Sequence, residues 1–261
     1  MPCNLVAYLL SRAAIITTCL VFPYWLSFML NDPLEVGWNT LDTLDTLSDA
    51  KCTNFDVFAF STNNLAFALF VVPHTLMARR RVKEALGITD QPYERPLFAF
   101  MSPITFLLSI SYWTPVSNCR RFDPAALSLG HVVISGSISV IAALYITAAM
   151  VTLPDHIFGT RRYKLGSDEK AEARLITSFP YNLVRHPAGA GFLWLLWSFP
   201  SYTVNHITLS IMWTLYVVPA TLLLEERSLK GPQGEFGAAY DCYAQEVSAF
   251  VPGKSLLRIA R

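Results

Sequence analysis

The chain contains few charged residues. Asp, Glu, Lys and Arg make up only 15% of its 261 residues, whereas a soluble domain usually carries about a quarter. The two signs nearly cancel, leaving a formal net charge of +1, so no general electrostatic attraction to nucleic acid is expected. Hydrophobic residues make up 53% of the chain. This composition argues against an ordinary soluble domain and favours a membrane protein.

The usual signatures of metal and nucleotide sites are also missing. The five cysteines stand at positions 3, 19, 52, 119 and 242, without a CxxC or Cys/His ligand spacing, so we expect no metal site. Neither GxxxxGK nor GxGxxG occurs, which removes the usual evidence for a phosphate-cradling loop. Cys52 and Cys119 are expected on the same side of a membrane, and the sequence leaves open whether they form a disulfide.

Apolar residues occur in six blocks that are expected to be membrane helices. A helix needs roughly 20 apolar residues to span a bilayer, and fewer when it is tilted or paired in a hairpin. The fifth block is short and ends at Pro200, so we expect it to form a helical hairpin with the sixth. The predicted fold is therefore all-α, a polytopic membrane helix bundle with a cytosolic amphipathic tail. The blocks span about 13–30, 56–77, 97–113, 130–153, 188–200 and 206–224.

The basic residues indicate how the chain is oriented. In a six-helix topology, all but three of the 20 Lys and Arg residues lie on one side, which the positive-inside rule assigns to the cytosol. The exceptions are Lys51, Arg120 and Arg121. Both termini are then cytosolic. We expect residues 1–55 to form an anchor helix with an acidic outer loop, and residues 56–261 to form the functional core.

Residues 181–200, YNLVRHPAGAGFLWLLWSFP, place a charged pair beside a strongly apolar run. Pro187 suits the first position of a helix, where its missing N–H costs no hydrogen bond. The helix start would attract an anion, and Arg185 could hold the same anion with a forked contact. Gly189 and Gly191 would let another helix or a flat ligand approach the backbone. The alternative is purely structural: a positive-inside arginine, a helix-starting proline and packing glycines.

Two adjacent acids, Glu225 and Glu226, end the sixth apolar block. A hairpin of the fifth and sixth blocks would bring them to the same membrane rim as Arg185 and His186. Charges of both signs at one rim could hold both ends of a zwitterion. The alternative is that one glutamate forms a structural ion pair with an arginine.

The segment EFGAAYDCYAQEVSAFVP (235–252) is expected to contain an amphipathic helix. Its aromatic residues could line a site near the two glutamates or anchor the helix at the membrane surface. These residues are Phe236, Tyr240 and Tyr243.

The second apolar block is interrupted by polar residues, among them Asn63 and His74. These two are 11 positions apart, close to three helical turns, so they share one face about 16 Å apart. Polar groups in a bilayer tend to face the bundle interior. They could form hydrogen bonds between helices, or His74 could line a site.

Three motifs together carry a family resemblance. RHPxxxGFxxxxWxxP, EERxL and FGxxYxxYxxxVxxFxP resemble the integral-membrane methyltransferase superfamily of isoprenylcysteine carboxyl methyltransferase and the phospholipid methyltransferases. VPHTLMARRRVK, ERPLFAF, YWTPV and DHIFGTRR resemble landmarks of the branch that contains methanethiol S-methyltransferase, NnrU and nurim. The similarity extends from about residue 60 to residue 252.

This resemblance implies that S-adenosylmethionine binds on the cytosolic side, between the RHP and EE motifs. Arg185 would clamp the cofactor carboxylate, a glutamate would bind its ammonium or ribose, and no metal would be required. His186 and His74 are candidates to accept the proton of the acceptor. The implied cofactor-binding residues are Arg185, His186, Gly191, Glu225, Glu226 and Tyr240.

Departures from the superfamily pattern indicate the acceptor. Gly189 stands where isoprenylcysteine-type enzymes have a tyrosine, which argues against a prenylated-protein or phospholipid acceptor. Pro73 replaces a glutamine, and KGPQGE lengthens the spacing before FG. We therefore expect methylation of a small thiol, such as methanethiol to dimethyl sulfide. The alternatives are a non-catalytic, nurim-like protein of the nuclear envelope or endoplasmic reticulum, and a partner in nitrogen-oxide metabolism suggested only by the NnrU name.

Overall fold

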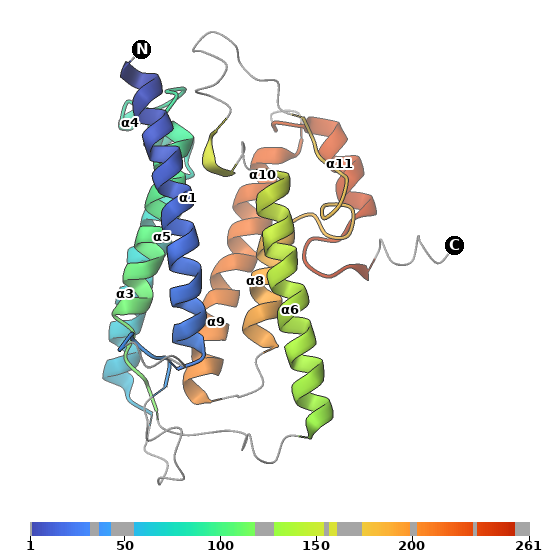
Figure 1. Cartoon of the computed structure of the whole chain (residues 1–261). Helices are drawn as coiled ribbons and strands as arrows, with labels where there is room; N and C mark the ends of the chain where they lie inside the picture. The colour runs from blue at the N-terminus through green and yellow to red at the C-terminus, as the bar shows by residue number, and fades with distance from the viewer. Residues whose placement is uncertain are drawn as a thin grey trace. The chain divides into compact units, whose positions relative to one another are not determined.

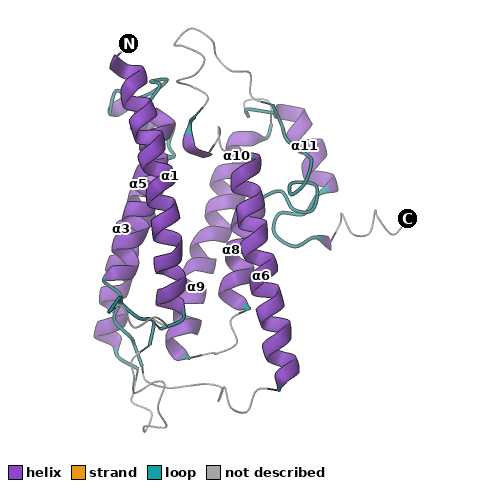
Figure 2. Cartoon of the chain, in the orientation of Figure 1, coloured by secondary structure: helices purple, strands orange, loops and turns teal. Residues whose placement is uncertain are grey.

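The computed structural model describes most of the chain, and the described part is helical (Figure 2). Within the described residues there is no β-strand, and the only extended pairings are two isolated bridges. The prediction of an all-α fold is confirmed. The described residues are 2–31, 37–42, 55–117, 128–153, 157–160, 174–198, 203–231 and 234–253. Cys52 and Cys119 lie outside them, so their pairing stays open.

The chain forms two compact units. The first comprises Met1–Phe122, Pro154–Ala171 and Tyr202–Ile207, and the second comprises Asp123–Leu153, Glu172–Ser201 and Thr208–Arg261. The boundary predicted after residue 55 separates an anchor segment from a functional core and does not describe compact units. It stays a prediction. All the predicted cofactor-binding residues belong to the second unit.

The first unit contains α1 (Pro2–Met29), α3 (Val57–Met77), α4 (Arg80–Ala85) and α5 (Glu94–Ser111) (Figure 1). α5 packs against both α1 and α3. α1 begins well before the expected residue 13, because Arg12 does not end the apolar stretch: its guanidinium carbon lies 5.3 Å from the centre of the Tyr8 ring. Long basic side chains can lie along apolar surface in this way.

Asparagine side chains satisfy backbone groups that follow α5. Asn63 accepts a hydrogen bond from the N–H of Thr114 at 2.8 Å and donates to its carbonyl at 2.7 Å. Asn205 accepts from the N–H of Val116 and donates to the carbonyl of Ser117. Buried backbone groups outside regular helices need such partners. For Asn63, these contacts support the structural alternative, in which the polar residues of this helix form hydrogen bonds to other parts of the bundle.

The second unit contains a helical hairpin beside a long apolar helix. Its helices are α6 (Leu129–Thr152), α8 (Pro187–Trp197), most of α9 (Val204–Pro219), the π-helix η2 (Ala220–Glu225), α10 (Glu226–Leu229) and α11 (Gly237–Glu246). α8 packs along α6. α8 and α9 contact each other through the rings of Phe192 and Trp213, and through a 2.9 Å hydrogen bond from Trp197 to Thr214. The predicted hairpin is therefore present.

Among the residues that the structure describes, four helical stretches are long and apolar enough to cross a bilayer, so the chain is an integral membrane protein. They are Leu5–Met29, Val57–Met77, Leu129–Thr152 and Val204–Leu229. α5 does not meet this criterion, and α8 is a shorter apolar helix of 11 residues. The expected count of six spans is thus not confirmed, although all six blocks contain helix.

Candidate functional site

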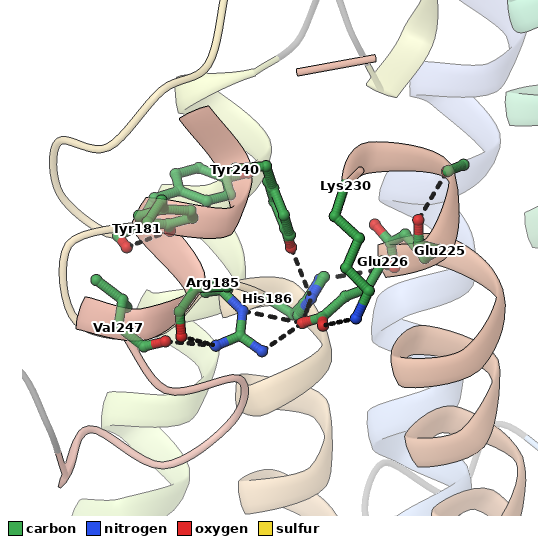
Figure 3. A network of polar contacts seen from close by, with 11 residues as sticks. Tyr181, Arg185, His186, Glu225, Glu226, Lys230, Tyr240 and Val247 are labelled. Atoms are coloured by element: carbon green, nitrogen blue, oxygen red, sulfur yellow. Dashed lines mark hydrogen bonds and ion pairs between the residues drawn. The ribbon is translucent and has the colours of Figure 1, made fainter. Parts of the chain in front are cut away.

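The centre of the candidate site is a buried ion pair between Arg185 and Glu226 (Figure 3). Both Nε and Nη2 of the guanidinium donate to the same carboxylate oxygen, Oε1, with the Nε contact at 2.9 Å. The side chains are 10% and 5% exposed. Nη1 donates to the backbone carbonyls of Ala244 and Val247. Four of the five guanidinium N–H groups thus have protein acceptors within the described structure.

His186 adds a second cationic group to the same carboxylate. Its Nε2 lies 3.0 Å from Oε1 of Glu226, and its Nδ1 lies 3.6 Å from Oε2 of Glu225. Burial by itself lowers the pKa of this imidazole, but the hydrogen bonds and charges of the two glutamates outweigh burial and raise the pKa above its ordinary value. The geometry therefore favours the imidazolium form. In that form His186 cannot accept a proton.

The start of α8 fixes the backbone of both residues. His186 is the N-cap and Pro187 stands at the first helical position, as predicted. The N–H of Arg185 donates to the carbonyl of Ser248 at 2.9 Å, and that of His186 donates to the carbonyl of Ala249. Val184 and Ser248 form a parallel bridge. Backbone hydrogen bonds and the guanidinium of Arg185 together hold the segment after α11 against the start of α8.

A π-helical turn positions the two glutamates. η2 follows Pro219, and the N–H of Glu226 donates to the carbonyl of Thr221, five residues earlier. A π-turn holds one residue more than an α-turn, so it rotates the residues that follow by about 100° relative to a continuous α-helix. This rotation directs Glu226 at Arg185 and His186, whereas the Glu225 side chain remains 57% exposed. The π-turn was not predicted from the sequence.

Tyrosines of α11 cover the ion pair. Tyr240 and Tyr243 are 3% and 7% exposed, so they are not available as membrane-surface anchors. The Tyr240 hydroxyl lies 3.5 Å from Nε2 of His186, and the Tyr243 hydroxyl donates to the carbonyl of Tyr181. Burial raises the pKa of the Tyr181 hydroxyl to about 12, with the charge of Glu225 adding to the shift. Burial likewise raises the pKa of the Tyr240 hydroxyl, which stays a donor at neutral pH.

The two glycines of the RHP segment have different surroundings. A Cβ on Gly191 would lie 2.7 Å from a side-chain carbon of Ile146 and 2.8 Å from the carbonyl oxygen of Ala142, both in α6. A Cβ on Gly189 would make an ordinary 3.4 Å contact with Phe250. Close helix packing therefore accounts for Gly191 without a ligand. Its predicted role in cofactor binding stays a prediction.

His74 belongs to the first unit, where it joins α3 to α5. Its Nδ1 lies 3.1 Å from the hydroxyl of Ser102, and its ring stacks on Phe70. The Ser102 hydroxyl donates to the carbonyl of Phe98 at 2.8 Å, so Nδ1 must be the donor to Ser102. In the neutral ring Nε2 then carries the lone pair. This contact is the inter-helix hydrogen bond of the structural alternative, and a catalytic role for His74 stays a prediction.

Comparison with curated proteins gives matches over most of the chain. Methanethiol S-methyltransferase 1 of Bradyrhizobium diazoefficiens is 28% identical over 253 residues, which cover 95% of this chain and 82% of the relative. Methanethiol S-methyltransferase of Crocosphaera subtropica is 25% identical over 236 residues, 89% of each chain. The protein of that name from Pseudomonas deceptionensis is 27% identical over 191 residues, 72% of this chain and 71% of the relative.

The chain is a homologue of the methanethiol S-methyltransferases. The predicted resemblance to that branch is confirmed. No protein-family model and no solved structure matches the chain.

Lys230 is a charged residue of this site that was not predicted from the sequence. Its Nζ lies 3.6 Å from Oε2 of Glu226, and its side chain is 45% exposed. Lys230 stands outside the RHP, EERxL and FG motifs. The signal that could have identified it is its spacing of four residues from Glu226 on a helix, which places the two side chains on one face.

Proposed function

We propose that this protein is an S-adenosylmethionine-dependent methyltransferase that converts methanethiol to dimethyl sulfide at the membrane. The observation that carries the proposal is the Arg185, His186 and Glu226 cluster, with half-exposed charges beside it, in a homologue of methanethiol S-methyltransferases. The cofactor would supply a methyl group activated on a sulfonium.

The residues of the second unit suit such a cofactor. Glu225 offers a carboxylate that is 57% exposed. On Glu226, Arg185 and His186 occupy Oε1, while the contact of Oε2 within the described structure is the 3.6 Å approach of Lys230. These carboxylate oxygens suit the cofactor's ammonium or ribose hydroxyls. The hydroxyl of Tyr240 would donate to a neighbouring polar atom, and Gly191 is the sixth residue that the resemblance assigns to cofactor binding.

The reaction is an in-line displacement. In that step the thiolate sulfur would bond to the methyl carbon as the bond from that carbon to the sulfonium breaks, and the thiol proton would go to a base. The protein contributes mainly by orienting the reactants and by helping to form the thiolate, which is the nucleophile. His186 and His74 remain the candidates for the base. His186 would first have to lose the proton that Glu225 and Glu226 stabilise.

We further propose that both chain termini and the ion-pair cluster face the cytosol. The asymmetry of the Lys and Arg residues supports this orientation. A charged cofactor would then reach the site from water, while a small apolar thiol could arrive through the bilayer.

The test uses purified protein in detergent or nanodiscs. Incubation with methanethiol and methyl-labelled S-adenosylmethionine should release labelled dimethyl sulfide into the headspace, and the Glu226→Ala variant should release much less. Folded protein that neither binds S-adenosylmethionine nor forms dimethyl sulfide would contradict the proposal. The nurim-like alternative predicts that negative result, but the relatives named above carry a methyltransferase name.

The same assay tests the acceptor. With methanethiol and a farnesylcysteine analogue in competition, we expect the thiol to be methylated in preference, because Gly189 stands in place of the tyrosine of isoprenylcysteine-type enzymes. Efficient carboxyl methylation of the analogue would exclude the small-thiol assignment. Discrimination among small thiols should be weak, since an apolar pocket separates homologues by only about 1–3 kcal/mol per methylene.

A further inference from the structure

Within the described structure, the Glu226 carboxylate has an exposed cationic partner, Lys230, and a buried one, Arg185. Arg185 is 10% exposed and gives its donors to Glu226 and to the carbonyls of Ala244 and Val247. Lys230 is 45% exposed. A ligand that made a forked contact with Arg185 would displace its bonds to Glu226 or to the chain after α11, whereas a ligand could reach the half-exposed Lys230 without breaking those bonds.

The contact between Lys230 and Glu226 leaves the ammonium able to bind elsewhere. The 3.6 Å separation from Oε2 is an ion-pair distance but longer than a hydrogen bond. An ammonium has three N–H donors. Figure 3 shows the Lys230 side chain extended over Glu226, on the same side of the cluster as Glu225.

The backbone of Lys230 is held in place at the end of α10. Its N–H donates to the carbonyl of Glu226 at 3.1 Å, and it forms a parallel bridge with Gly237. The neighbouring Leu229 accepts from the N–H of Phe236 at 3.1 Å. The ammonium is thus presented from a fixed position and not from a loose tail.

We propose that Lys230 binds the α-carboxylate of the cofactor's methionine moiety, and that Arg185 acts instead as a positioning residue for Glu226. This inference rests on the proposed function and changes the assignment that the sequence suggested. The methionine moiety is a zwitterion whose ammonium and carboxylate share one carbon. Half-exposed Glu225 and the Oε2 of Glu226 provide the negative partner, and Lys230 provides the positive one.

The experiment compares two ligands on three proteins. S-Adenosylmethionine and its decarboxylated analogue, which lacks only the α-carboxylate, are titrated into the parent, Lys230→Gln and Arg227→Gln in nanodiscs. Arg227 is the matched control, an exposed basic residue on α10, the short helix that ends just before Lys230. Lys230→Gln should weaken the binding of S-adenosylmethionine about fivefold to tenfold, in the range of a partly exposed charge-assisted contact. It should leave the affinity for the analogue unchanged. Arg227→Gln should bind both ligands like the parent.

The comparison of ligands separates a carboxylate contact from a general effect of charge. An equal loss for both ligands, or no loss for either, would overturn the assignment of Lys230. A parent that binds neither ligand would overturn the proposed function itself. If the preference of the parent for S-adenosylmethionine over the analogue survives in Lys230→Gln but is absent in Arg185→Lys, the arginine is the clamp.

Discussion

The guanidinium of Arg185 and the carboxylate of Glu226 are buried against each other, although 41 positions separate them in the sequence. The pair connects the start of α8 to the end of the α9–η2–α10 helical stretch. Through Ala244 and Val247, the same guanidinium also holds the segment after α11. Arg185 is therefore the residue on which three separate pieces of the second unit converge.

Replacing Arg185 should reduce stability as well as cofactor binding. Removing one partner of a buried ion pair leaves the other charge uncompensated, which typically costs about 3–5 kcal/mol. Arg185→Ala should therefore lower the free energy of unfolding by an amount in that range, which is measured as a lower unfolding temperature in detergent. Arg227→Ala, at an exposed site, should stay near the parent. The additional variant Arg185→Met/Glu226→Met should lose less than the sum of the single changes, because the two residues interact. If Arg185→Ala is as stable as the parent, the arginine acts only in cofactor binding and not in stability.

The titration of His186 should make stability depend on pH. In the unfolded chain the imidazole titrates near 6.5, and in the folded protein Glu225 and Glu226 raise its pKa. Its ion pairs therefore contribute fully below about pH 6.5, and the contribution is lost as the pH rises through the folded-state pKa. The unfolding temperatures of the parent and His186→Gln should differ most at low pH and converge as the pH is raised. A difference that stays constant between about pH 5.5 and pH 9 would contradict the assignment of an imidazolium.

Local sequence signals predicted the helices well where a cap or a charge marked the end of an apolar run. α3 begins at Val57 because Asp56 accepts hydrogen bonds from the N–H groups of Phe58 and Ala59. α6 begins after Ser128, which caps the N–H of His131. The apolar run and its cap were both present in the sequence, so these boundaries could be predicted to within about two residues.

The features of the site that could not be predicted from the sequence depend on contacts between residues far apart in the chain. The hairpin predicted that Arg185 and Glu226 would meet, but nothing local signals that the guanidinium also binds the carbonyls of Ala244 and Val247. These acceptors support the proposal that Arg185 is a positioning residue, while its predicted role as a clamp for the cofactor stays a prediction. The π-turn before Glu225 is likewise set by packing, since π-turns have no reliable sequence signature beyond the preceding Pro219.

The orientation of the chain can be tested with reporters. A reporter fused after Arg261 should be cytosolic, and one inserted near Asp45 should be on the opposite side, because a six-helix topology would place most Lys and Arg residues on the side of the termini. Accessibility to a membrane-impermeant label distinguishes the two sides. The reverse labelling pattern would exclude a cytosolic cofactor site.

The glycines of α8 provide a matched pair of substitutions. Gly191→Ala should destabilise the protein by about 1–3 kcal/mol, because the new Cβ would overlap α6, including the Ala142 carbonyl at 2.8 Å. Gly189→Ala should be neutral or stabilising, since its Cβ meets Phe250 at an ordinary 3.4 Å and alanine favours the helix. Thermal unfolding of both variants under identical conditions provides the comparison. Equal effects would show that the packing of α8 on α6 does not require a glycine at position 191.

Substitutions of His74 can separate the roles of its two ring nitrogens. An asparagine amide reproduces the Nδ1 donor that faces Ser102, whereas a glutamine amide comes closer to the position of Nε2. If Nε2 accepts the thiol proton, His74→Asn should fold like the parent and lose about 10²- to 10⁴-fold in turnover, the usual contribution of a general base. Ser102→Ala is the control, because it removes the inter-helix hydrogen bond while keeping the imidazole. Dimethyl sulfide formation is measured beside the unfolding temperature. Parent-like turnover in His74→Asn, together with reduced stability in Ser102→Ala, would show that the histidine only joins α3 to α5 and that the base must be sought at His186.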